Sequence, residues 1–162
     1  MTGTLLQLNT KSRVPGEFGL PKAPVPSLRV TSAGAEGDYN RWRTKQAQGD
    51  PDQAILLLTR EVLDALVKEG WPVKAGDLGE NFTVDGIVES ALQPGVRLRA
   101  GTLLLEVTKA CDPCDEVYSL PYIGPERGPA FVRTLVGRRG WFAKVLEGGT
   151  VITGAAIQLE PS

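Results

Sequence analysis

Short apolar stretches separated by glycine and proline dominate the chain, and most have the length and alternation of β-strands. Leu5, Leu6 and Leu8 predict a first strand, and 28–30 alternates as a short second one. The continuous apolar run 54–58 predicts a fully buried strand. A hairpin is expected over 96–107, with its turn at Ala100–Gly101. Further strands are expected over 82–84, 141–146, 151–152 and 156–159, the third entered through a two-residue turn at 148–149.

Two stretches have helical spacing instead. Thr59 offers a side-chain oxygen that can cap a helix, and Gly70 supplies its end. Between them, one apolar face is expected to comprise Val62, Leu63, Leu66 and Val67. A second helix is expected to start at Pro129 and to stop at Gly137, with Phe131–Leu135 and Val132–Val136 as its apolar pairs.

Two segments show neither strand alternation nor helical spacing. The stretch 21–26 contains three prolines, which cannot donate to a ladder, so it is excluded from the centre of a sheet. The polar stretch 32–53 is too long for an ordinary connection and is expected to be functional or mobile. Many short strands, 19 glycines and two helices together favour a β-rich fold, a β-barrel with peripheral helices.

Length and charge narrow the function classes. At 162 residues the chain is most simply one domain, 1–162, able to bury a core without disulfides. Its 18 basic and 19 acidic residues argue against nucleic acid or an anionic membrane as the main partner. No apolar run approaches a membrane span or a signal peptide, and two cysteines make no disulfide scaffold. We therefore expect a cytoplasmic protein with free thiols.

The chain has no histidine, and its two cysteines stand together at Cys111 and Cys114, where an apolar strand ends. A Ser-His-Asp triad and a Cys-His pair both need an imidazole, so both are excluded. A zinc site would lack ligands, and a thioredoxin-like pair would lack its strand–helix setting. Cys111 is interpreted as a small buried apolar residue. Cys114 is the candidate nucleophile or soft metal ligand.

Four motifs in order resemble the MOSC family, the domain named for the C-terminal part of molybdenum cofactor sulfurases. They are Gly37–Asp38 with 52–55, the stretch GDLGENFTVDG at 76–86, the hairpin 96–108 leading to Pro113–Cys114, and GWFAKVLEGG at 140–149 with Gly154 after it. The resemblance covers most of the chain, from about Ser27 to residue 160.

The resemblance implies a β-barrel that binds a molybdenum-pterin cofactor, with Cys114 as metal ligand or sulfur carrier. Cofactor contacts are expected from Asp38, Gly79, Glu80, Asn81 and Lys109. No pyridoxal-phosphate desulfurase domain is expected in so short a chain, so a sulfur donor protein or a redox partner would act with it. Both a sulfurtransferase-like role and a molybdenum-dependent reductase are consistent with this family.

The sequence departs from the family pattern at two positions. Cys111 stands where many members have an Arg, and Gln48 stands where many have a His. A non-catalytic barrel that binds a small anion or a protein is therefore the alternative function.

Several other side chains have plain structural interpretations. The backbone N–H groups of the Gly-rich loop 76–81 could surround an anion, and Asn81 could equally close a turn. The basic pair Arg138–Arg139 and Lys144 are interpreted as solvated surface. Trp42, Trp71 and Trp141 are interpreted as packing residues.

Overall fold

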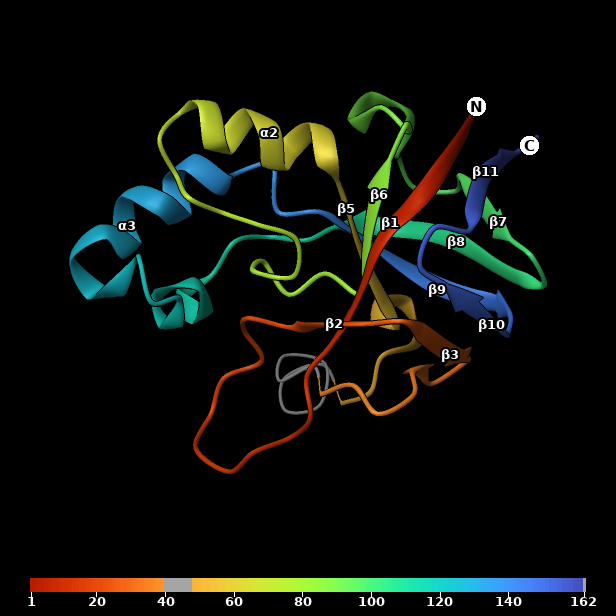
Figure 1. The fold of residues 1–162 in the computed structure, drawn as a ribbon, viewed down its shortest axis with the longest axis horizontal. Helices are drawn as coiled ribbons and strands as arrows, with labels where there is room; N and C mark the ends of the chain where they lie inside the picture. Colours follow the sequence, from red (N-terminus) through yellow and green to blue (C-terminus); the bar gives the residue numbers. More distant parts are fainter. Residues whose placement is uncertain (40–47, 162) are drawn as a thin grey trace.

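Seven β-strands close into a barrel in the computed structural model, which describes residues 1–39 and 48–161 (Figure 1). Around the barrel run β1 (Thr2–Thr10), β11 (Ala156–Glu160), β7 (Arg97–Ala100), β8 (Leu103–Ala110), β9 (Trp141–Glu147), β5 (Ile55–Thr59) and β6 (Phe82–Asp85), which returns to β1. A β-rich barrel with peripheral helices is thus confirmed.

The long strand β1 closes the barrel. Thr2–Thr4 pair with β11 on one side, and Thr4–Leu8 pair with β6 on the other. A register shift between Leu5 and Gln7 bends the strand as a bulge does. So small a barrel is filled by its own side chains, and fully buried leucines and Phe82 occupy its interior.

A second, three-stranded sheet lies beside the barrel. It contains β3 (Ser27–Thr31), β4 (Gly34–Ala35) and β10 (Gly149–Ile152), in the order β10–β3–β4. Only Gly148 separates β9 from β10, and β10 pairs with β3 instead of turning back onto β9. The proline-rich stretch forms β2 (Ala23–Val25) at the end of the large sheet, where missing donors cost least.

The helix α2 (Arg60–Lys68) connects the parallel strands β5 and β6. Thr59 caps it as predicted, since its side-chain oxygen accepts a hydrogen bond from the N–H of Val62. Val67 was expected on the buried face but is 52% exposed. The buried stripe consists of Val62, Leu63 and Leu66, and Val67 lies about 90° from its centre on a 3.6-residue helix.

The second helix, α3, runs from Gly124 to Leu135 and so begins earlier than predicted. Pro129 lies inside it, and Pro125 occupies the first turn, where a missing N–H costs nothing. Val136 caps the end and is exposed instead of packed. Its first six residues contain two prolines and two glycines, which have low helix propensity, so the sequence does not indicate a helix there.

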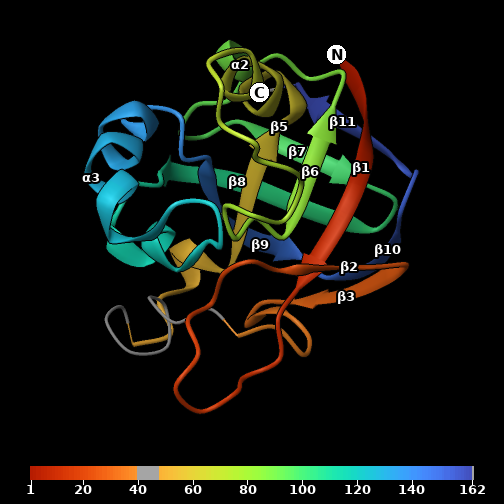
Figure 2. The same cartoon turned by 60° about the vertical axis from the view of Figure 1, so that its left-hand side comes forward.

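The helices cover one side of the barrel (Figure 2). A second apolar cluster lies between them and the outer wall, built around buried Leu58, Leu66, Leu78 and Phe131. Phe131 contacts Trp71 with a ring-centroid distance of 4.7 Å, so Trp71 packs as predicted. Trp42 lies outside the described residues.

Three short 3₁₀ segments complete the described elements: η1 (Pro51–Gln53), η2 (Glu89–Ala91) and η3 (Asp115–Ser119). The segment η3 packs against α3 and holds the chain directly after Cys114. A search of the described helices finds none with the length and apolarity of a membrane span.

Candidate functional site

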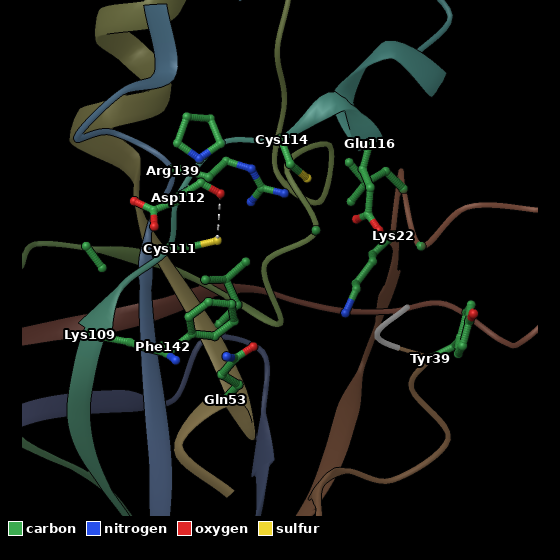
Figure 3. Close-up of a pocket in the computed structure, with 16 residues that line it drawn as sticks. Lys22, Tyr39, Gln53, Lys109, Cys111, Asp112, Cys114, Glu116, Arg139 and Phe142 are labelled. Carbon is green, nitrogen blue, oxygen red and sulfur yellow. Dashed lines mark hydrogen bonds between the residues drawn. The ribbon is translucent and has the colours of Figure 1, made fainter. Parts of the chain in front are cut away.

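A cavity of about 310 Å³ opens between the barrel wall and the segment that joins β8 to η3. Its lining comes from separate parts of the chain (Figure 3): Gly19, Leu20 and Lys22; Tyr39; Gln53 and Leu56; Gly79; Lys109–Glu116 without Asp115; and Arg139 with Phe142. Both cysteines line it, so the segment singled out in the sequence forms one wall.

The two cysteines are free thiols, each partly exposed in the cavity. Cys111 follows β8 directly, and its N–H donates to the carbonyl of Gly140 at 2.8 Å. Burial raises the pKa of both thiols, and so does the carboxylate of Glu116. The charge of Arg139 acts in the opposite direction on both pKa values. Both thiols are therefore mainly protonated at neutral pH.

Arg139 was interpreted as exposed surface, and this was wrong: it is 5% exposed and its guanidinium reaches into the cavity (Figure 3). It immediately precedes Gly140 and β9, which pairs with β8 up to Ala110 opposite Trp141. This pairing continues with Cys111 beside Gly140, so residue 139 lies next to the start of the cysteine segment. Its neighbour Arg138 does lie at the surface, where it pairs with Glu69.

The Gly-rich loop 76–81 touches the cavity through Gly79. A Cβ at Gly79 would lie 2.4 Å from Cδ2 of Leu20, and its φ of +81° favours glycine. The sequence left open whether N–H groups of this loop surround an anion or close turns within the protein. The N–H groups of Gly76, Asp77, Gly79 and Asn81 all donate within the protein. Attraction for an anion in the cavity therefore comes from charged side chains and not from the backbone N–H groups of this loop.

Asp38 and Asn81 lie behind the wall and are joined to each other. Asn81 donates from Nδ2 to Asp38 Oδ2 at 2.9 Å, and its Oδ1 accepts from the N–H of Leu56. Asp38 Oδ2 also accepts from Lys22 Nζ at 2.6 Å, with side chains 6% and 2% exposed. Lys22 is a cavity residue, so this pair supports the wall from behind.

Glu80 is fully buried beneath the same loop. Its Oε1 accepts from the N–H of Gly76 at 2.7 Å and from Thr83 Oγ1 at 2.8 Å. Oε2 has no hydrogen-bond partner in the described structure, and burial raises the pKa of the carboxyl group. Asp38, Glu80 and Asn81 are absent from the lining, whereas Gly79, Lys109 and Cys114 belong to it.

The lining residues that sequence reasoning missed include Lys22, Arg139 and Cys111. Lys22 lies in a proline-rich stretch and Arg139 in a basic pair, and both contexts usually indicate surface. A signal existed for Cys111, since its spacing from Cys114 brings both to one segment end. For Arg139 the signal is weak: it precedes the Gly–Trp motif, whose strand pairs with the cysteine-bearing one.

Chemically, the cavity combines two soft sulfur atoms with buried positive charge. Within residues 1–39 and 48–161, no cluster of three or more His, Cys, Asp or Glu side chains could hold a metal ion. A metal at this site would need most of its ligands from another molecule, with a thiolate from the protein.

Comparisons with known proteins agree with this architecture. The structure of YuaD from Bacillus subtilis superposes with a TM-score of 0.78 at 22% identity, covering 97% of this chain and 94% of that chain. At that identity the likeness shows the fold alone. The structure of YiiM from Geobacillus stearothermophilus gives a TM-score of 0.72 at 26% identity, covering 98% of this chain and 75% of that one.

At the sequence level, protein YiiM of Escherichia coli (strain K12) is 31% identical in an alignment of 137 residues that covers 82% of this chain and 58% of that protein. The chain thus spans less than two thirds of that relative's length. The family model of the MOSC domain matches residues 44–158. With the barrel, the ordered motifs and this match in agreement, the chain belongs to the MOSC domain family.

Proposed function

We propose that this protein binds a molybdenum-pterin cofactor in the cavity, with Cys114 as metal ligand or sulfur carrier. The family is associated with that cofactor. The observation that carries the proposal is the position of Cys114 on the wall of a cavity that also contains a buried, unpartnered guanidinium. Two free thiols suit a reducing compartment, so we propose a cytoplasmic location.

The residues present fit such a group. A volume of about 310 Å³ is at the lower end of small-molecule sites, roughly 300–1,000 Å³. Leu20, Leu56 and Phe142 offer apolar surface to a planar ring, and Arg139 offers charge to an anionic substituent. Thiolate sulfur is the donor that thiophilic metals prefer.

Each predicted site residue has a role in this proposal. Gly79 and Lys109 would contact the cofactor directly, because both line the cavity. Asp38, Glu80 and Asn81 would position the wall, because their polar atoms are engaged with other parts of the protein. When bound, the cofactor supplies the metal and its redox chemistry.

Cys114 must lose its Sγ proton before it can act as ligand or sulfur acceptor. Burial opposes that loss and the charge of Arg139 favours it, so the free protein holds the thiol protonated and available. Sulfur bound to Cys114 would come from a donor protein, and a redox role would need an electron-donating partner.

The test is to produce the protein in cells that make the cofactor and to measure molybdenum by mass spectrometry and pterin by fluorescence after oxidation. We expect both in the wild type, retention of both in Cys111→Ser, and loss of molybdenum or of its sulfur in Cys114→Ser. A wild-type protein without molybdenum and without pterin would overturn the proposal.

Arg139 also favours a second candidate function, a barrel that binds a small anion without catalysis. It predicts that Cys114→Ser leaves anion binding unchanged. It also predicts slow alkylation of Cys114 across neutral pH. Cofactor content that depends on Cys114 would exclude it.

A further inference from the structure

Arg139 has an unusual environment for an arginine. Its side chain is 5% exposed, yet Nε and Nη1 are buried without a hydrogen-bond acceptor anywhere in the described residues. A buried polar group without a partner is costly, and a buried charge more so. Such an arrangement persists when a ligand supplies the missing acceptors.

The other cations on the wall have acidic partners. Lys22 Nζ lies 2.6 Å from Asp38, and Lys109 Nζ lies 3.9 Å from Asp50. No carboxylate in the described part of the chain comes within salt-bridge distance of Arg139. An anion would therefore bind at the guanidinium.

The barrel fixes where that guanidinium lies. The N–H of Cys111 donates a hydrogen bond of 2.8 Å to the carbonyl of Gly140. Arg139 precedes Gly140, so its side chain starts next to the segment that carries the two cysteines. Figure 3 shows its guanidinium near both sulfur atoms, whereas Lys22 extends away from them on the other side of the cavity. An anion held by the guanidinium would lie beside the thiols.

We propose that Arg139 is the anion anchor of the cavity, and that its guanidinium binds a phosphate-type oxyanion next to Cys111 and Cys114. The anion is either the phosphate monoester of an organic ligand or a free oxyanion. This deepens the proposed function by naming the residue that holds the ligand's anionic group, and it relies on that function only for the ligand's identity. Guanidinium matches this geometry because its N–H groups bind two oxygens of one anion.

Alkylation kinetics test the anchor in the cofactor-free protein. In a Cys111→Ser background, the rate of Cys114 alkylation is measured with iodoacetate, an anion, and with iodoacetamide, its neutral analogue. The Cys114 thiolate attacks the iodomethylene carbon of both reagents and displaces iodide, so the ratio of the two rates cancels any change in the ionisation of Cys114. The ratio reports how strongly the cavity attracts negative charge.

We expect Arg139→Gln to lower the iodoacetate-to-iodoacetamide ratio by about tenfold, the lower range of electrostatic enhancement. Arg138→Gln is the matched control, because it removes the same charge one residue away at the surface, and its ratio should stay within about twofold. Arg139→Lys should keep most of the ratio. If Arg139→Gln does not fold, Arg139→Met removes the same charge and takes its place in both the ratio and the competition experiment below.

Competition identifies the class of anion. At constant ionic strength, inorganic phosphate should lower the ratio in the Arg139 protein and leave it unchanged in Arg139→Gln. Phenyl phosphate acting at lower concentration than inorganic phosphate would indicate a monoester on an organic ligand, and the reverse order would indicate a free oxyanion. A ratio insensitive to both Arg139→Gln and phosphate would overturn the proposal.

The two proposals can fail separately. If the wild-type protein contains no pterin but its alkylation ratio still depends on Arg139, the proposed function is wrong and the anion anchor stands. If the protein contains pterin but Arg139→Gln does not change the ratio, the proposed function stands and the anion anchor is wrong.

Discussion

The buried pair of Lys22 and Asp38 allows a quantitative test of how the cavity wall is held. Asp38→Asn keeps the shape of the side chain and removes its charge. The ammonium of Lys22, 2% exposed, would then remain buried without its counter-charge. Breaking such a pair costs about 3–5 kcal/mol. Because Lys22 also faces the cavity, which water can enter, we expect the lower end, about 3 kcal/mol.

The reverse substitution should cost less. In Lys22→Met, Asp38 keeps two donors, the side-chain amide of Asn81 at 2.9 Å and the N–H of Lys11 at 3.0 Å. The double variant Lys22→Met/Asp38→Asn removes both charges and should be more stable than Asp38→Asn alone. The expected coupling energy is about 1–3 kcal/mol, as for residues in one ion-pair network.

Urea denaturation of the four proteins measures these free energies of unfolding, and a chain of this size should lose roughly 6–12 °C in Tm for about 3 kcal/mol. Glu17→Gln is the control, because it breaks the pair with Lys11, whose Glu17 side chain is 52% exposed, and should cost less than about 1 kcal/mol. A coupling energy below about 0.5 kcal/mol, or Asp38→Asn as mild as Glu17→Gln, would refute the reasoning.

Three further predictions concern single positions. Gly140→Ala should cost about 3 kcal/mol or more, since its φ is +97° and a Cβ would lie 2.5 Å from the carbonyl of Leu57; Gly154→Ala, with positive φ but open space, should cost only about 1–2 kcal/mol, and equal losses in denaturation would contradict this. Arg139→Met should raise stability by about 1–3 kcal/mol, because it removes an unpartnered buried charge and keeps the apolar stem; a lower Tm would count against the site. The raised pKa of Glu80 makes the folded protein bind a proton more tightly than the unfolded chain, so this group's stabilisation is present at low pH and is lost as pH rises through the folded pKa. Glu80→Gln should therefore gain stability relative to wild type with rising pH, and a pH-independent difference between the two unfolding curves would disprove it.

Local pattern was sufficient for most elements of the fold. Alternation and short apolar runs predicted the strands at 28–30, 54–58, 82–84 and 141–146, because the side-chain period of a strand is a local property. The helix cap at Thr59 was also predicted from the local sequence. The helix at 124–135 was placed too late, because prolines and glycines oppose helix locally and packing of Phe131 against Trp71 outweighs them.

The residues of the candidate site also differ in how far the sequence predicts them. Cys114 was identifiable because a Pro–Cys after a hairpin is a short, ordered motif, and the structure sets it in the cavity wall. Asp38, Glu80 and Asn81 were predicted from motifs too, but they do not line the cavity. Whether a polar side chain faces a ligand or a neighbouring strand depends on contacts up to 72 residues away in sequence, as between Asn81 and Asn9.

The sequence by itself determined the chemistry that is available: no imidazole, two thiols, a near-neutral charge and strands enough for a barrel. Only the tertiary structure decided that Arg139, one of two adjacent arginines, is buried beside those thiols while Arg138 pairs with Glu69 outside. The physical reason is the pairing of β8 with β9, which joins segments about thirty residues apart and directs two successive side chains to opposite environments.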